Sequence, residues 1–282
     1  MADELTRPVE AYKNAGFLKS ADARPIRILA EYLEPVSRLH KYRIKDTIVF
    51  YGSARAISMD EAQKQYSEIV NREDFNSKEN ENDRIALSGA KSMIKLAEYY
   101  ENARELARRL TQWSLSLQSG QRFIICSGGG PGMMEAANRG AKEAGGISIG
   151  MNISILREQY PNAYITPELS FEFHYFFMRK FWFMYLAKAL VVMPGGFGTM
   201  DELFEVLTLI QTKKLQKVIP IVLFGSEYWK DVIHFEKYLE WGTIENSDLS
   251  LFTFVDTVDE AYNYLVRELT TRFAEQRKFW YL

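Results

Sequence analysis

The sequence predicts an α/β protein with a Rossmann-like, doubly wound and mostly parallel sheet that carries helices on both faces. The first observation behind this prediction is an alternation, because short β-branched, apolar runs are followed by longer segments in which apolar residues recur with a helical period. The second is a set of glycine turns between such runs and the helices that follow. In the clearest case, a buried strand at 189–193 enters a turn at 194–198, and the next helix carries Leu203, Val206, Leu207 and Ile210 on one face.

Composition limits the class of protein. The chain has 282 residues, enough for one large α/β domain or two small ones, and 47% of them are apolar. A net charge of −2 and a pI near 6.1 disfavour nucleic-acid binding through bulk electrostatics. The single cysteine, Cys126, excludes an intrachain disulfide and is typical of a reducing compartment. The start does not resemble a signal peptide, and charged residues interrupt the most apolar run, so we expect a cytoplasmic protein without a membrane partner.

We expect the chain to have two parts. Residues 1–44 are predicted to be a helical N-terminal extension, with a helix at 23–39 that serves either packing or an oligomer contact. Residues 45–282 are predicted to form one Rossmann-like domain, which begins with a strand at 46–51. The charged, Asn-rich residues 71–84 favour an exposed insertion in this domain. A continuous apolar stripe predicts a long helix at 88–118.

The rest of the chain alternates between strands and helices. A strand at 122–126, a helix at 133–144 and a strand at 147–151 form a β-α-β unit of about 30 residues, the length that a right-handed crossover requires. Residues 160–173 are expected to be irregular or an edge strand. The other expected elements are an aromatic-rich helix at 175–188, strands at 218–224 and 252–255, and helices at 227–240 and 259–279.

Two glycine turns carry the functional prediction, because both lie at the carboxyl edge of the predicted sheet, where ligands of this fold bind. Each turn opens a helix, so backbone N–H groups without intrahelical partners are available to an anion. We therefore predict a phosphate site that forms one end of a nucleotide pocket. Its residues are Gly128, Gly129 and Gly130 in the first turn, and Pro194, Gly195, Gly196, Gly198 and Thr199 in the second.

Neither turn matches the two most familiar nucleotide motifs. The pattern G-x-G-x-x-G that starts at Gly128 fails at Met133, and no Walker A sequence occurs, so NAD binding and ATP hydrolysis are not favoured. A third turn, with Gly52, Ser53 and Arg55, follows the first strand at the same edge. Its polar side chains either contact a phosphate or ribose or belong to an ordinary turn. The three histidines are scattered, so we expect no metal site.

Two charged residues are candidates for catalysis. Glu202 stands three residues after Thr199, and this spacing fits either a capping box or a catalytic carboxylate that points into the pocket. Thr257 and Glu260 repeat the spacing without a glycine turn. Arg179 lies in an aromatic segment, where a guanidinium needs an anionic partner, either Glu202 or a substrate phosphate. The aromatic residues around it are expected in the core or a subunit interface rather than against a base.

Together, these motifs resemble the LOG ("Lonely guy") family of nucleoside 5′-monophosphate phosphoribohydrolases, whose members are often called possible lysine decarboxylases. Residues 194–202 match the signature P-G-G-x-G-T-x-x-E fully. The resemblance also includes G-S-x-R at 52–55, G-G-G-P-G-x-M-E-A-A at 128–137 and Met178-Arg179-Lys180, and it covers roughly residues 46–255. The N-terminal extension, the 71–84 insertion and the aromatic run around Arg179 resemble the longer bacterial branch.

The resemblance implies a LOG-type nucleotide-binding catalytic domain that cleaves the N-glycosidic bond of AMP or a cytokinin riboside monophosphate. It implies that Arg179 and Glu202 are catalytic, that no metal or other cofactor is needed, and that the protein forms a homodimer or a higher assembly of dimers. A lysine decarboxylase would need pyridoxal phosphate on a lysine that nothing in the sequence marks. Two alternatives stay open. One is a non-catalytic nucleotide or cofactor carrier of the same fold, such as a molybdenum-cofactor carrier; the other is an assembly or regulatory protein that acts through its N-terminal extension.

Overall fold

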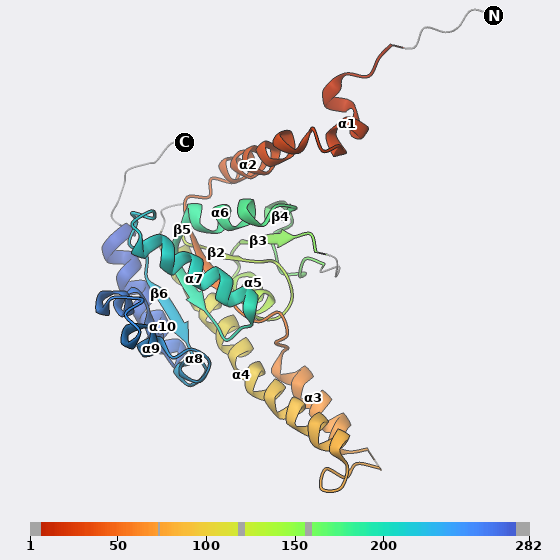
Figure 1. Ribbon diagram of the computed structural model, residues 1–282, viewed down its shortest axis with the longest axis vertical. Helices are drawn as coiled ribbons and strands as arrows, with labels where there is room; N and C mark the ends of the chain where they lie inside the picture. Colours follow the sequence, from red (N-terminus) through yellow and green to blue (C-terminus); the bar gives the residue numbers. More distant parts are fainter. Residues whose placement is uncertain (1–6, 73, 118–121, 156–159, 275–282) are drawn as a thin grey trace, which may run out of the picture.

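The computed structural model describes residues 7–72, 74–117, 122–155 and 160–274 of the chain. Within these residues, parallel strands form one sheet in the order β4-β3-β2-β1-β5-β6-β7, which confirms the predicted doubly wound α/β fold (Figure 1). The strands are β1 (Thr47–Tyr51), β2 (Ile124–Ser127), β3 (Ser148–Ile153), β4 (Ser170–Phe173), β5 (Ala187–Val192), β6 (Ile221–Phe224) and β7 (Thr253–Val255).

The chain order reverses beside β1, and this reversal brings three turns next to one another. β1 pairs with β2 on one side and with β5 on the other, so that Phe50 lies opposite Ser127 and Tyr51 opposite Val192. All three strands therefore end at the same level of the sheet. In parallel doubly wound sheets, ligands bind outside the carboxyl ends of the strands at such a reversal.

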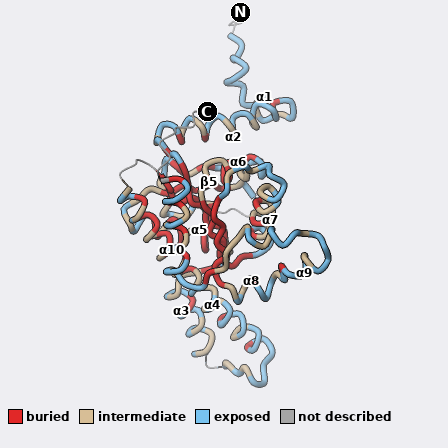
Figure 2. The backbone as a smooth tube through the Cα atoms, turned by 90° about the vertical axis from the view of Figure 1, so that its left-hand side faces the viewer, coloured by how far each residue is buried: buried red, intermediate tan, exposed pale blue. Residues whose placement is uncertain are grey.

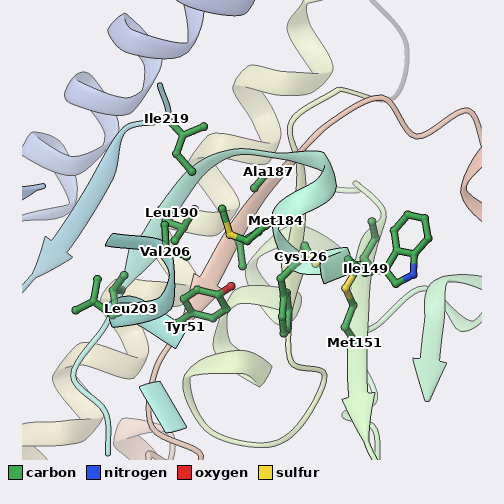
Figure 3. Packing of buried hydrophobic residues seen from close by; sticks show 14 of the residues in the cluster. Tyr51, Cys126, Ile149, Met151, Met184, Ala187, Leu190, Leu203, Val206 and Ile219 are labelled. Atoms are coloured by element: carbon green, nitrogen blue, oxygen red, sulfur yellow. The ribbon is translucent and has the colours of Figure 1, made fainter. Parts of the chain in front are cut away.

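Helices cover both faces of the sheet, so its strands are buried (Figure 2). Alternation along β1 directs Ile48 and Phe50 to one face and Val49 and Tyr51 to the other. The first face packs against α4 (Glu81–Ser116), α5 (Met133–Glu143) and α10 (Val258–Leu269). The second face packs against α6 (Phe176–Leu186), α7 (Phe197–Gln211), α8 (Ser226–Val232) and α9 (Phe235–Glu240). Buried residues of the second face are drawn in Figure 3.

A buried ion pair joins the opposite, amino edge of the sheet. The Asp46 carboxylate accepts hydrogen bonds from Nε and Nη2 of Arg122 at 2.9 and 2.7 Å, and from the Phe123 N–H at 2.6 Å. The Asp46 and Arg122 side chains are 4% and 9% exposed. Because burying two charges is costly unless their remaining hydrogen bonds are made, this satisfied network fixes the start of β1 against β2.

The N-terminal helices project from the body of the molecule (Figure 1). They are a short 3₁₀ turn η1 (Ala11–Lys13), α1 (Ala15–Lys19) and α2 (Arg24–Lys41), and the last of these contains the helix predicted at 23–39. α2 packs against α6, and the Trp182 indole N–H of α6 donates to the Glu31 carbonyl of α2 at 3.0 Å. Its outer face leaves Ile26, Leu29 and Leu33 about half exposed.

A helical hairpin forms the other projection. The sequence did not predict α3 (Met59–Val70), and α4 begins at Glu81 rather than at residue 88. Residues 81–84 of the predicted insertion are therefore helical. Asn80 caps this helix through a hydrogen bond from the Asn82 N–H, and Asp83 pairs with Arg72 across the connecting loop.

Other elements differ from the prediction mainly at their ends. The helix predicted at 227–240 is broken into α8 and α9, because Ile233 has an extended backbone. The closing helix α10 ends at Leu269 and continues as a π-helical turn over Thr270–Ala274, and predicted residues 275–279 lie outside the described part. β4 is an edge strand preceded by a 3₁₀ turn η2 (Pro167–Leu169), and another 3₁₀ turn η3 (Asn246–Leu251) precedes β7. No helix in the described ranges is both long and apolar enough to cross a membrane.

Candidate active site

Backbone hydrogen bonds hold the three predicted turns together at the carboxyl edge of the sheet. The Ser53 N–H donates to the Pro194 carbonyl at 3.0 Å, which joins the turn after β1 to the turn after β5. The Ser53 carbonyl accepts from the Met133 N–H at 3.0 Å, which joins it to the turn after β2. The structure thus brings the glycine-containing segments 52–55, 127–132 and 194–198 into one place, although more than 70 residues separate the first from the second.

Two of the glycines are required by close approach. Gly132 has φ +74°, and a Cβ there would lie 2.2 Å from the Ser53 carbonyl oxygen, so only glycine permits the contact between the first two turns. A Cβ on Gly195 would lie 2.2 Å from Thr199 Oγ1, so the turn can fold back on the first turn of α7 only without a side chain at that position. Gly132 thus permits the contact between two turns, and Gly195 permits the tight connection between β5 and α7.

The second turn exposes the N-terminus of α7. Gly196 is the N-cap, makes no side-chain cap, and is followed by Phe197, Gly198 and Thr199 as the first helical residues. Gly196, Phe197 and Gly198 are exposed, and Thr199 is buried. The first N–H groups of a helix have no intrahelical partner and carry the positive end of the helix dipole. This end of α7 is therefore suited to bind a phosphate group.

The capping-box interpretation of Thr199 and Glu202 is wrong. α7 begins at Phe197, so Thr199 is its third residue rather than its N-cap, and Glu202 lies in its second turn. Glu202 is hydrogen-bonded to Arg179 instead. The same spacing at Thr257 and Glu260 does form a capping box, at the start of α10. Identical spacing thus has two outcomes, depending on where the helix starts.

Arg179 and Glu202 form a mostly buried ion pair. Arg179 Nη2 and Glu202 Oε1 are 3.2 Å apart, and the two side chains are 13% and 14% exposed. The guanidinium lies 5.3 Å from the Phe176 ring centre and 5.5 Å from that of Phe183. Among the described residues, Arg179 Nε is buried without a hydrogen-bond partner. Arg179 therefore keeps a donor group available to another acceptor.

The pKa of Glu202 is perturbed. Burial raises this pKa to about 7, and the nearby Arg179 charge opposes the rise. The charge of Glu202 in turn contributes to a raised pKa of Tyr51, after the larger effect of burial, and burial likewise raises the pKa of Cys126. Tyr51 and Cys126 lie near the ends of β1 and β2, and Figure 3 shows Tyr51 beside Leu203 and Val206 of α7. A carboxyl group with a pKa near 7 can exchange protons at neutral pH, as a general acid or base must.

Other charged side chains near the turns have different roles. Lys180 pairs with Asp201 and Glu205 of α7, both at 2.8 Å, and is 19% exposed. A shallow hollow of about 360 Å³ lies beside these residues, and neither Arg179 nor Glu202 lines it. Ser53 Oγ accepts the Arg55 N–H at 3.1 Å, so this hydroxyl shapes its own turn. Among the described residues, the exposed Arg55 guanidinium forms no ion pair.

Two asparagines that belong to no motif in the sequence hold the turn after β2. Asn162 donates to the carbonyls of Gly129 and Gly130, and fully buried Asn138 accepts from Ser127 Oγ at 2.6 Å. Tyr51 was also missed, although it directly precedes Gly52 and that position could have marked it. No local pattern could have identified Asn162, because its partners are distant in the sequence. In the part of the chain that the structure describes, no group of three or more His, Cys, Asp or Glu side chains could hold a metal.

Comparisons with known proteins agree with the motifs. A family model described as "Possible lysine decarboxylase" matches residues 134–265. No curated protein matches the chain in sequence. Among solved structures, a structural-genomics target, TM1055, is 19% identical, with 79% of this chain and 99% of that chain covered and a TM-score of 0.47.

Two further solved structures are similar at the same low level. The molybdenum cofactor binding protein of Rippkaea orientalis is 18% identical, with 61% of this chain and 88% of that chain covered and a TM-score of 0.43. The Moco carrier protein of Chlamydomonas reinhardtii is 18% identical, with 80% of this chain and 99% of that chain covered and a TM-score of 0.40.

Proposed function

We propose that the chain hydrolyses the N-glycosidic bond of a nucleoside 5′-monophosphate. Two observations support this proposal: a family model described as "Possible lysine decarboxylase" matches residues 134–265, and the motif at 194–202 resembles the signature of the LOG family. The substrate class is AMP or a cytokinin riboside monophosphate, and the products are the free base and ribose 5-phosphate. The observation that carries the proposal is the mostly buried Arg179–Glu202 pair, whose glutamate lies in the second turn of α7, next to the turn that exposes the N-terminus of this helix.

The 5′-phosphate binds at the start of α7 in this proposal. The N–H groups of Gly196, Gly198 and Thr199 donate to its oxygens, and the turn at 128–130 and Arg55 lie at the same edge of the sheet. A charge at a helix N-terminus is stabilised by about 0.3–1 kcal/mol at the surface and more where it is partly buried. Holding the phosphate fixes the ribose, so binding energy remote from the reacting atoms positions C1′.

Glu202 acts on the sugar. Breaking the bond between C1′ and the base develops positive charge on the ribose, as in other glycoside hydrolyses. The Glu202 carboxylate, one helical turn below the phosphate site, stabilises that charge and accepts a proton from the attacking water. The water oxygen bonds to C1′ as the bond between C1′ and the base breaks. The departing base takes a proton from solvent, and Glu202 returns the proton of the attacking water to solvent. Arg179 orients Glu202, and its unpaired Nε is a donor for the leaving base.

The arrangement of lysines does not favour a decarboxylase. Pyridoxal phosphate would need a lysine at the site for its Schiff base. Lys180, next to Arg179, is engaged by two carboxylates of α7. Burial lowers the pKa values of Lys188 and Lys217, but Lys188 lies near the start of β5 and Lys217 precedes β6, both at the opposite edge of the sheet.

We also propose that the protein acts as a homodimer or an assembly of dimers. Supporting this proposal, Phe176, Phe177 and Phe181 on α6 are between 39% and 54% exposed, and Phe181 contacts Tyr32 of α2 with a ring-centre distance of 5.7 Å. Contiguous exposed apolar side chains are typical of interaction surfaces. Light scattering coupled to size-exclusion chromatography measures the mass directly, and a monomer of 32.7 kDa would contradict the proposal.

A release assay tests the reaction. Purified protein is incubated with a panel of purine and pyrimidine nucleoside 5′-monophosphates, and the free base is measured by chromatography. We expect release from at least one nucleotide, no release from the matching nucleoside, and a rate about 10²–10⁴-fold lower in Glu202→Gln. Wild-type turnover in that variant would refute the catalytic role. Tight nucleotide binding without release of any base would favour the carrier alternative.

A further inference from the structure

We infer that Asn162 is a positioning residue that locks the peptide groups of the phosphate-binding turn after β2 in the orientation that an anion requires. The inference rests on the proposed function, because it concerns the binding of the same phosphate group. Asn162 itself lies outside the family's motifs, in the segment between β3 and β4.

The contacts of Asn162 converge on two successive carbonyl groups. Its backbone N–H donates to the Gly129 carbonyl at 2.8 Å, and its side-chain Nδ2 donates to the carbonyls of Gly129 and Gly130, both at 3.0 Å. Its Oδ1 accepts the Tyr164 N–H at 3.1 Å, so the amide nitrogen must face the turn. Both carbonyls are therefore held on the side of Asn162.

A network behind the turn fixes Asn162 itself. Nδ2 also donates to Oδ1 of Asn138 at 3.0 Å, and that oxygen accepts from Ser127 Oγ at 2.6 Å. Asn138 is fully buried in α5, and its own Nδ2 donates to the Ile149 carbonyl at 3.2 Å. The Gly129 N–H is already bonded to Ser127 Oγ at 3.1 Å. The network thus joins the end of β2 and the start of β3 to the turn.

This geometry determines which peptide group can meet an anion. In a trans peptide, the carbonyl and the following N–H point in opposite directions, so the Gly130 N–H points away from Asn162. Gly129 has φ +74°, and glycine rotates between such conformations at little cost. Without Asn162, the Gly129–Gly130 peptide could rotate and direct its carbonyl oxygen toward the phosphate. Two negative groups would then repel each other.

Asn162→Asp tests the lock with little change in shape. Aspartate keeps the oxygen that accepts the Tyr164 N–H but replaces the amide donor with a carboxylate oxygen that repels both carbonyls. Asn14→Asp is the matched control, since Asn14 caps α1 through an oxygen that aspartate also provides, far from the sheet. Calorimetry measures the binding of ribose 5-phosphate and inorganic phosphate, and steady-state kinetics measures KM and kcat.

We expect Asn162→Asp to bind ribose 5-phosphate at least tenfold more weakly and to raise KM by a similar factor, with kcat within about threefold of the wild type. Such a split indicates lost phosphate binding, whereas general loosening of the site would lower kcat as well. Asn162→Ala should show a smaller shift in the same direction, and Asn14→Asp none.

Several results would overturn the inference. The first is an unchanged affinity for ribose 5-phosphate in both Asn162 variants, and the second is a fall in kcat at constant KM. The third is unfolding of both variants, which would assign Asn162 a role in stability alone. A wild-type protein that binds ribose 5-phosphate but releases no base would refute the proposed reaction, while the calorimetric comparison would still decide the role of Asn162. A wild type that binds neither ligand would refute both.

Discussion

Replacing Glu202 with glutamine should stabilise the folded protein at neutral pH while it removes activity. The pKa of Glu202 is about 7 in the folded protein against an ordinary 4.5. Between these two values, the folded protein holds a proton that the unfolded chain has released, so stability falls as the pH rises. At 1.36 kcal/mol for each pH unit, the loss amounts to about 3 kcal/mol above pH 7. Glutamine is neutral at every pH, and its oxygen can still accept from Arg179, so the variant avoids this loss.

Urea unfolding at pH 5 and pH 8 measures the effect in wild type and Glu202→Gln. At each pH, the free energy of unfolding of the wild type is subtracted from that of the variant. The informative quantity is the change in this difference between pH 5 and pH 8, because the effects of the substitution on packing are the same at both pH values and cancel. We expect the variant to gain about 3 kcal/mol on the wild type between these pH values. Glu205→Gln is the control, since it removes a carboxylate of the same helix whose side chain is more exposed, at 36%. A difference that does not change with pH would refute the reasoning.

Two further predictions concern the carboxyl edge of the sheet, and a third concerns its amino edge. If Glu202 acts as a carboxylate, the ratio kcat/KM should rise with pH and level off above about pH 7, and activity that is highest in acid would contradict this role. Gly195→Ala should lower the free energy of unfolding by about 1–3 kcal/mol, because the new Cβ would lie 2.2 Å from Thr199 Oγ1. Gly196→Ala should change it by less than about 0.5 kcal/mol, because no neighbouring side chain or backbone atom lies within 4 Å of the new Cβ. Equal melting temperatures of the two variants would refute this packing argument. Asp46→Ala should cost about 3–5 kcal/mol in denaturant unfolding because it leaves Arg122 buried without its partner, and KM should not change; a small cost would show that the pair is not stabilising.

The sequence predicted the fold and the meeting of the three turns at one edge of the sheet, because both depend on local chemistry. Buried strands and glycine turns are recognisable from short segments, and parallel strands place their carboxyl ends at one edge. The pairing of Arg179 with Glu202 was one of two alternatives, and the structure shows it. The aromatic segment around Arg179 offers no acidic side chain, and this was enough to predict that the guanidinium pairs with an anion from elsewhere.

What the sequence did not predict depends on helix ends and distant contacts. Whether Thr199 caps a helix depends on where α7 begins, and the observed N-cap, Gly196, lies three residues before Thr199. α4 extends to Glu81 because Asn80 caps it and Asp83 pairs with Arg72. Asn162 contacts Gly129 across 33 residues, and no periodicity records such a contact.

A crystal structure of Glu202→Gln with a bound nucleoside monophosphate would test the central claim most directly. We expect the phosphate against the N–H groups that open α7, and C1′ next to the side chain at position 202, with that side chain on the ribose side of the phosphate. A nucleotide whose phosphate lies away from the three turns, or whose sugar faces away from position 202, would contradict the account.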